Sequence, residues 1–158
     1  MMLQASRASA KQNAVNFTLI ELLAVIVILA VIALIATPLI MGTITKAKKN
    51  SAVDSAYGYM KAVEQAIGEA QVDDPTGAFD IAGATATVSG SGSQAGNQVQ
   101  IKFAGSSSVD KTLSVNYKGS EPENGGTLKY DANGRVTDGT LHIGGYTVTI
   151  ANDKATVN

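Results

Sequence analysis

The sequence predicts an α+β fold in which one long N-terminal α-helix packs through its amphipathic half on an antiparallel β-sheet head. Three observations lead to this class. Residues 17–41 are almost entirely apolar, residues 42–74 carry an amphipathic helical pattern, and residues 75–158 contain short segments of alternating polar and apolar residues. Alternation indicates strands that bury one face, and we expect the apolar stripe of the helix to cover that face.

Composition argues against several classes of function. The chain has 158 residues and no cysteine, so it is not a disulfide-stapled scaffold. Residues 50–158 contain seven Lys or Arg against twelve Asp or Glu, a balance of −5 that argues against binding nucleic acid. His142 is the single histidine, and the acidic residues lack metal-ligand spacing. We therefore expect neither an enzyme nor a cofactor or metal site.

The apolar run is long enough to cross a membrane. Residues 22–36 contain no polar side chain, and the 25 residues of segment 17–41 would form about 37 Å of helix, which spans a bilayer core. A secretory signal peptide is the first alternative, but its apolar part normally ends after roughly 7 to 15 residues at a small-residue cleavage site. Here the run is longer and continues into a polar helix, so we favour a transmembrane or filament-core helix.

Glu21 is a carboxylate near the start of this apolar run. A charge near hydrocarbon is costly, so the residue needs a partner or a function, unless it lies at headgroup depth and reaches water. Cleavage just before Phe17 would create an amine one helical turn from Glu21. The carboxylate of one subunit could then pair with the amine of a neighbouring subunit, but only at one axial offset between the two. Any other offset would bury both charges without a partner.

The residues around this carboxylate resemble a known processing site. Asn16-Phe17-Thr18-Leu19-Ile20-Glu21-Leu22-Leu23, followed by the apolar run, is similar to the site of type IV prepilins and type II secretion pseudopilins. The resemblance covers about the first third of the chain. It implies that a membrane prepilin peptidase removes a basic leader, residues 1–16, by cutting between Asn16 and Phe17. It further implies that Phe17 is then N-methylated and that Glu21 directs assembly.

One position departs from the family pattern. Asn16 stands where the family has glycine, the residue without a Cβ to obstruct close approach of the backbone to a peptidase. Asparagine tolerates unusual backbone angles better than most residues. We therefore expect cleavage to be slowed at this bond.

Pro38 and Gly42 mark a weak point in the helix. Pro38 lies twenty-one residues after Phe17, where many family members carry a proline. A proline removes one backbone donor, so we expect the helix to kink or loosen over residues 34–42 and to extend there under load in a filament. The alternative is an ordinary proline kink of the kind that membrane helices tolerate.

The second part of the helix and the head follow from periodicity and turn residues. Apolar groups at Val53, Ala56, Tyr57, Met60, Val63 and Ile67 form the expected core stripe. The helix should end at residues 73–77, which combine two Asp, a Pro and a Gly. We expect strands at 84–89, 98–103, 112–117, 127–131, 140–143 and 146–151, with turns at 132–134 and 144–145 and a final pairing through 152–157.

Two smaller features leave alternatives open. Lys46, Lys48 and Lys49 adjoin the apolar run and either bind lipid phosphates or an acidic neighbour, or form a solvated collar. Asp131, Asn133 and Asp138 lie around a glycine, as in the calcium loops of some pseudopilins, but the ligand set is incomplete.

The resemblance also implies a fold and a function. It implies a pilin fold and a structural subunit of a type IV pilus, stored in the cytoplasmic membrane with the leader inside and the head outside, and extracellular after assembly. The implied partners are further copies of the chain in a helical filament, prepilin peptidase, the assembly platform with its ATPase, and membrane lipid. The alternatives are a pseudopilin of a secretion or DNA-uptake machine and a membrane-anchored binding domain that never polymerises.

Overall fold

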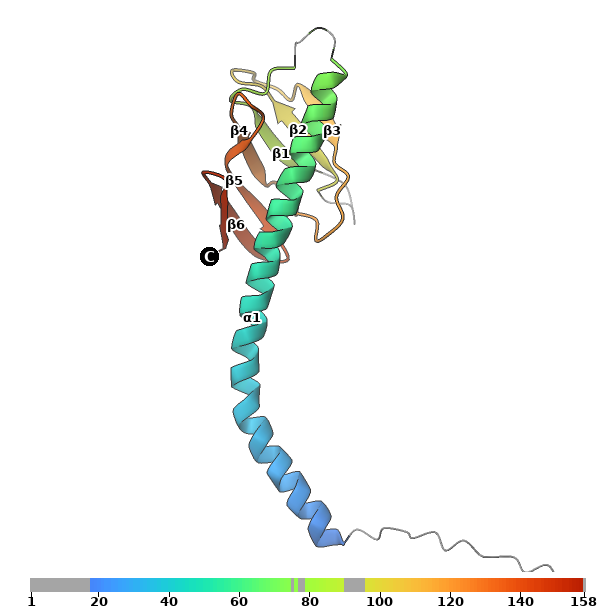
Figure 1. Cartoon of the computed structure of the whole chain (residues 1–158), viewed down its shortest axis with the longest axis vertical. Helices are drawn as coiled ribbons and strands as arrows, with labels where there is room; N and C mark the ends of the chain where they lie inside the picture. The colour runs from blue at the N-terminus through green and yellow to red at the C-terminus, as the bar shows by residue number, and fades with distance from the viewer. Residues whose placement is uncertain (1–17, 75, 77–78, 90–95, 158) are drawn as a thin grey trace, which may run out of the picture. The chain divides into compact units, whose positions relative to one another are not determined.

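The computed structural model describes residues 18–74, 76, 79–89 and 96–157. As predicted, the described residues form one long N-terminal helix followed by an antiparallel sheet (Figure 1). The helix is α1 (Leu19–Val72), and it ends within one residue of the predicted stop. The strands are β1 (Thr85–Ser89), β2 (Gln98–Lys102), β3 (Lys111–Ser114), β4 (Thr127–Tyr130), β5 (Val136–Ile143), β6 (Tyr146–Ala151) and β7 (Lys154–Val157).

The chain divides into two compact units, residues 1–43 and 44–158, and α1 runs through both. The described part of the first unit is the helical segment that begins at Leu19. The second unit contains the remainder of α1 and the whole sheet. Each unit is described by itself below.

The sheet of the second unit is open, with the strand order β3-β2-β1-β4-β5-β6-β7, and every neighbouring pair is antiparallel. Because β1 pairs with both β2 and β4, it lies between two meanders that run in opposite directions. The edge strands β3 and β7 have four residues each, and each begins with a lysine. Short, charged edges disfavour pairing with further strands.

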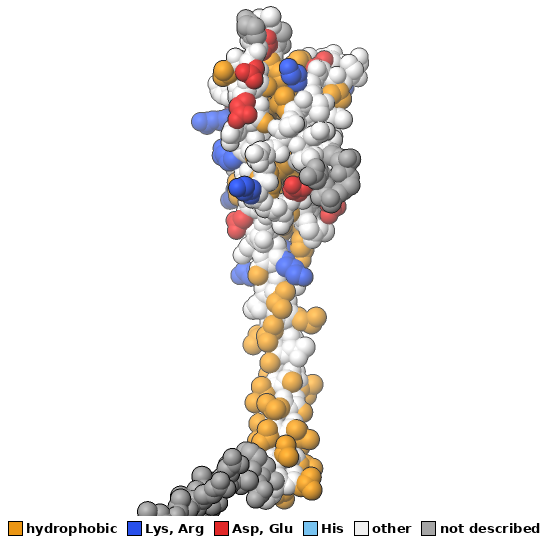
Figure 2. Space-filling view, turned by 90° about the vertical axis from the view of Figure 1, so that its right-hand side faces the viewer, with side chains coloured by type: hydrophobic (Ala, Val, Ile, Leu, Met, Phe, Trp, Pro, Cys, Tyr) orange, Lys and Arg blue, Asp and Glu red, His pale blue; other side chains and the backbone are white. Residues whose placement is uncertain are grey.

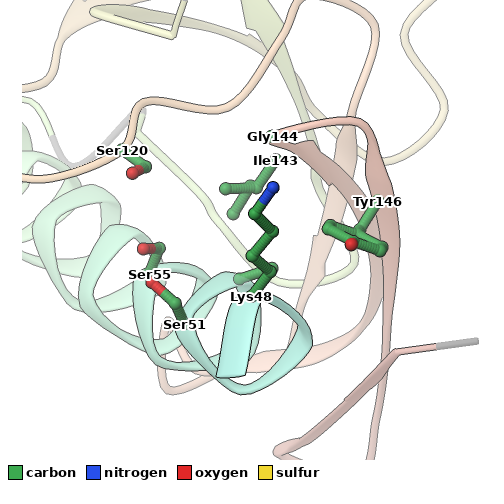
Figure 3. A pocket seen from close by; sticks show the side chains of 8 residues that line it. Lys48, Ser51, Ser55, Ser120, Ile143, Gly144 and Tyr146 are labelled. Carbon is green, nitrogen blue, oxygen red and sulfur yellow. The ribbon is translucent and has the colours of Figure 1, made fainter. Parts of the chain in front are cut away.

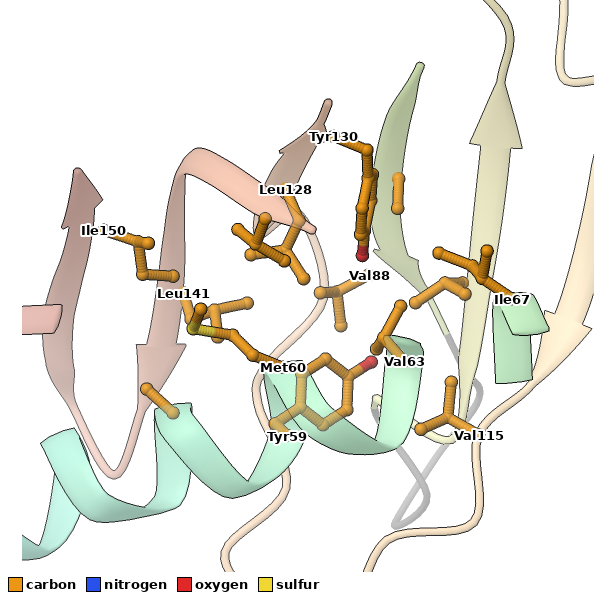
Figure 4. Close-up of a cluster of buried hydrophobic side chains, with 14 of the residues drawn as sticks. Tyr59, Met60, Val63, Ile67, Val88, Val115, Leu128, Tyr130, Leu141 and Ile150 are labelled. Atoms are coloured by element: carbon orange, nitrogen blue, oxygen red, sulfur yellow. The ribbon is translucent and has the colours of Figure 1, made fainter. Parts of the chain in front are cut away.

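The core lies between α1 and one face of this sheet (Figure 4). The helix buries Ala52, Ala56, Tyr59, Met60, Val63 and Ile67. Four residues of the predicted stripe are therefore fully buried, and Val53 is partly buried against the core. Tyr57 was predicted wrongly, since it is exposed, while Ala52 and Tyr59 are buried in its place. A tyrosine that can satisfy its hydroxyl is as suitable for a core as an aliphatic residue.

Three tyrosine hydroxyls tie α1 to segments distant in sequence. Tyr59 donates to the Gly96 carbonyl (2.7 Å), and burial raises the pKa of this phenol well above its usual value. The Tyr57 hydroxyl accepts from the Ala155 N–H of β7 (2.9 Å). Tyr117 donates to the Ser55 carbonyl of α1 (3.0 Å) and packs edge-on against Tyr59, with ring centroids 5.6 Å apart. In a chain without disulfides, these contacts attach both the loop before β2 and the last strand to the helix.

The predicted turns are confirmed. Gly144 and Gly145 join β5 to β6 with φ of 58° and 79°, the positive angles of a two-residue type I′ hairpin. Asn152 and Asp153 do the same between β6 and β7, with φ of 51° and 61°. The start of β5 was predicted wrongly, at residue 140 rather than Val136.

The error at β5 has a local cause. Asp138 and Gly139 look like turn residues, yet both lie inside the strand. A Cβ at position 139 would overlap the Thr127 carbonyl oxygen of β4, so glycine there permits close approach of the two backbones.

The packing of Tyr117 against α1 predicts opposite effects for two helix glycines. A Cβ at Gly58 would lie 3.0 Å from Tyr117 Cε2, whereas a Cβ at Gly68 would meet nothing within 4 Å. Gly68→Ala should raise the free energy of unfolding by about 0.5–1 kcal/mol through helix propensity. Gly58→Ala should lower it by about 1 kcal/mol, because the tyrosine must shift. Urea unfolding in uncharged detergent measures the free energy of unfolding of both variants. An equal increase in the two variants would contradict this packing of Tyr117.

Candidate functional site

The apolar segment of α1 has no protein cover in the described structure. Every large apolar side chain from Leu19 to Met41 is between 52% and 89% exposed. This helix is long and apolar enough to cross a membrane, with a mean hydropathy of 3.2 over its most apolar 18 residues, none of which is buried. Its apolar side chains are shown in Figure 2. Without such a cover, a helix that is apolar on all sides would expose its whole apolar surface to water. It must therefore be surrounded by lipid or by other helices.

Glu21 takes part in a capping box at the start of α1. The Glu21 Oε2 atom accepts from the Thr18 N–H (2.9 Å) and from the Thr18 hydroxyl (2.8 Å). The Glu21 N–H in turn points to Thr18 Oγ1 at 3.3 Å. Thr18 is thus the N-cap and Glu21 the third helical residue, which is the reciprocal arrangement of the motif. The box satisfies backbone donors that the helix leaves unpaired at its N-terminus.

The capping box leaves half of the carboxylate available. Both Thr18 donors contact Oε2, and Oε1 has no hydrogen-bond partner among the described residues. Glu21 is also the single ionisable side chain in the sequence from residue 18 to residue 43. A cation that pairs with it must therefore come from outside this stretch.

The helix is continuous through Pro38 and Gly42. Because proline has no N–H, the Leu34 carbonyl lacks its intrahelical donor. Two threonine hydroxyls donate to nearby carbonyls: Thr37 to Ala33 (2.7 Å) and Thr43 to Ile40 (2.8 Å). Loosening of this stretch under load stays a prediction, since the structure describes it in one helical state.

The described members of the predicted set, Glu21, Pro38 and Gly42, are spread along α1 and do not converge on one site. Asn16 and Phe17 fall outside the described residues. Glu21 and Pro38 are seventeen residues apart, about 25 Å along a helix. Sequence reasoning missed Thr18, although a Thr three residues before a Glu at the head of an apolar run is the signal of a capping box.

The calcium hypothesis finds no ligand set. Asp131 Oδ1 accepts from the backbone N–H groups of Asn133 (2.8 Å) and Arg135 (2.9 Å), so this carboxylate is used by the β4–β5 turn. The hydrogen bond from the Arg135 N–H is the main cause that holds the pKa of Asp131 below its usual value. Asp138 lies inside β5, opposite Lys129. Within the part of the chain that the structure describes, no group of three His, Cys, Asp or Glu could hold a metal ion.

Comparison with known proteins adds no relative: no protein-family model, no curated protein and no solved structure matches the chain. The fold and the site define a class by themselves. The chain combines a sheet-covered amphipathic helix with an apolar helical segment that is able to cross a membrane and begins with one capped carboxylate.

The stretch around Gly42 offers a test of helix stability. A Cβ at this position would meet nothing within 4 Å, so Gly42→Ala adds helix propensity without a clash. A gain of about 1 kcal/mol should slow amide hydrogen exchange of the neighbouring helical residues about fivefold, provided that they exchange by local opening. Exchange of the full chain in detergent measures this. Gly68→Ala is the control, since it should leave the rates around residue 42 unchanged, and unchanged rates in Gly42→Ala would contradict the weak point.

Proposed function

We propose that this chain is the structural subunit of a type IV pilus filament, with a pilin fold, stored in the membrane through its apolar helix and assembled by packing that helix against further copies. One observation carries the proposal: a helical segment exposed on every side that is almost entirely apolar and carries one charged side chain, a carboxylate at its start. Lipid satisfies such a surface in the stored precursor, and neighbouring helices satisfy it in the filament. The work of the protein is then mechanical and interfacial.

Glu21 supports polymerisation over simple anchoring. A simple anchor gains from this acid no more than the helix cap, and the charge costs free energy in an apolar segment. In a filament, Oε1 of this carboxylate accepts from the α-amino group that removal of residues 1–16 would create at Phe17 of a neighbouring subunit. A buried pair of this kind adds little net stability compared with apolar packing, but leaving either member alone is strongly unfavourable. The pair therefore selects the axial register of the subunits.

The exchange of lipid for helix contacts makes assembly reversible. Lipid tails are as apolar as leucine side chains, so no large hydrophobic free energy drives helices together in a bilayer. Extraction of a subunit into an apolar filament core is then nearly balanced. An assembly platform with an ATPase, as the resemblance implies, can drive that step in either direction.

The second unit supplies the exposed head. Its net charge is acidic, its sheet edges are short and begin with lysine, and its core is closed by the second part of α1. These features suit a module that remains soluble on a filament surface outside the cell. A pseudopilin uses the same architecture for a short filament, and long surface fibres built from this chain would distinguish the two.

Glu21→Gln tests the role of charge separately from the role of the cap. Glutamine can replace glutamate in a capping box, so this variant keeps the start of α1 but cannot neutralise a buried amine. We expect the variant to insert into the membrane normally and filament yield to fall about a hundredfold or more, the loss typical of an unmatched buried charge. Sheared filaments are quantified against the membrane-bound pool by immunoblotting.

Thr18→Ala is the matched control for this experiment. It removes the hydroxyl of the cap and retains the Glu21 charge, so it should fray the first turn of α1 and leave most filament assembly intact. If Glu21→Gln assembles as well as the unaltered chain, the carboxylate serves the cap alone. The chain would then be better described as an anchored domain.

The processing bond gives a second test of the proposal. Mass spectrometry of natively purified protein should find a chain that begins at N-methylated Phe17. Asn16→Gly should increase the rate of leader removal severalfold, because glycine clears the path of the backbone into a peptidase. A pulse–chase experiment compares the two rates. Native chains that keep residues 1–16 in every condition, and remain monomeric, would refute the filament.

A further inference from the structure

A small open pocket, referred to below as the cavity, lies in the second unit between α1 and the β5–β6 hairpin (Figure 3). Its volume is about 270 Å³, which is near the lower end of the roughly 300–1,000 Å³ found for sites of drug-sized ligands. Lys48, Ser51 and Ser55 line it from one face of the helix, at relative positions i, i+3 and i+7. The remaining lining residues are Ala52, Ser120, Ile143, Gly144 and Tyr146.

The chemistry of the lining suits an oxyanion. Lys48 is the one charged residue among the eight, and its side chain extends across the cavity toward Ile143 (Figure 3). Three serine side chains add hydroxyl donors. Among the described residues, neither the Lys48 ammonium nor the hydroxyls of Ser51 and Ser120 have a hydrogen-bond partner. An ammonium and unused hydroxyls that line one pocket can donate to phosphate oxygens.

The place of the cavity in the chain indicates where the phosphate comes from. Lys48 follows the last residue of the apolar run, Met41, by seven residues, which reach at most about 25 Å even when fully extended. With the apolar segment in a bilayer, the cavity is therefore within reach of the headgroups. Lys46 and Lys49 flank Lys48 in sequence, and clustered lysines beside a membrane segment attract anionic lipid. Tyrosine, here Tyr146, is enriched at headgroup depth.

We propose that this cavity binds the phosphate of an anionic phospholipid headgroup while the chain is stored in the membrane. The inference rests on the proposed membrane-stored state and adds a specific lipid site to it. It also accounts for an otherwise unfavourable feature of the sequence. With the head outside, Lys46, Lys48 and Lys49 oppose the usual bias of positive charge toward the cytoplasm, and a bound anionic headgroup compensates part of that charge.

The test uses the full unassembled chain in an uncharged detergent. Short-chain phosphatidylglycerol, phosphatidylcholine of the same chain length and inorganic phosphate are titrated separately, and the amide chemical shifts of residues 48–55 are followed by NMR. We expect phosphatidylglycerol to bind most tightly. Lys48→Gln should weaken its binding about tenfold and Ser51→Ala about threefold. Lys46→Gln removes the same charge outside the lining, so it should weaken binding less than about twofold.

Three results would overturn the proposal. If Lys46→Gln and Lys48→Gln weaken phosphatidylglycerol binding equally, the lipid is held only by the general charge of the lysines. If inorganic phosphate binds as tightly as phosphatidylglycerol, the ligand is a soluble anion. Absent lipid binding, together with crosslinking of Lys48 to a carboxylate of a second copy in assembled filaments, would assign the cavity to a subunit contact. The titration uses unassembled chains, so a failure of the lipid site would not change the outcome expected for Glu21→Gln. A failure of filament assembly would likewise leave the lipid titration valid.

Discussion

The constraint on which everything else depends is a helical segment with no polar face. From Leu19 to Met41 the apolar surface of α1 is open on all sides, and that surface cannot remain in water. If the segment leaves one apolar environment, such as lipid, it must enter another, such as a bundle of helices. A chain under this constraint is either anchored permanently or passes its apolar helix from lipid to other helices. The proposed filament is the second solution, in which the membrane acts as a store of subunits.

The second half of α1 meets the opposite condition, since one face is buried and the other is wet. Ala56 and Met60 pack into the sheet, while tyrosine hydroxyls at the margin bind backbone groups of distant segments. Tyr57 holds the N–H of Ala155 in the last strand, and Tyr117 holds a carbonyl of the helix itself. The sheet therefore folds against a helix whose other half must be shielded from water by something other than the sheet. α1 thus joins a segment that is covered by the sheet to a segment that needs lipid or other helices.

Much of this fold was predictable because it depends on local periodicity. The stop after Val72, the paired glycines at 144–145 and the alternation of β6 are all short-range signals. The failures are long-range. Gly139 looks like a turn until the carbonyl of Thr127 is placed against it, and the core position of Tyr59 depends on the Gly96 carbonyl, 37 residues away.

The candidate sites divide in the same way. Glu21 is conspicuous in sequence because a carboxylate is rare in an apolar run. The Thr18–Glu21 spacing of a capping box was also present in the sequence but was overlooked, and the hydrogen bonds between the two residues make it plain. The cavity at Lys48 could not be predicted at all. Its far wall comes from Ser120 and from the β5–β6 hairpin, which lie more than 70 residues along the chain and reach the helix only through the sheet topology.

The capping box and the proposed register pair make compatible demands on Glu21. The box uses Oε2 and fixes the direction of the carboxylate relative to the helix axis, while Oε1 stays available. Two donors from Thr18 offset part of the cost of a charge in apolar surroundings before any partner arrives. They also remove side-chain freedom that pairing would otherwise have to restrict. The cap is therefore the device that would make a lone acid tolerable in the stored subunit and ready for an amine in the filament.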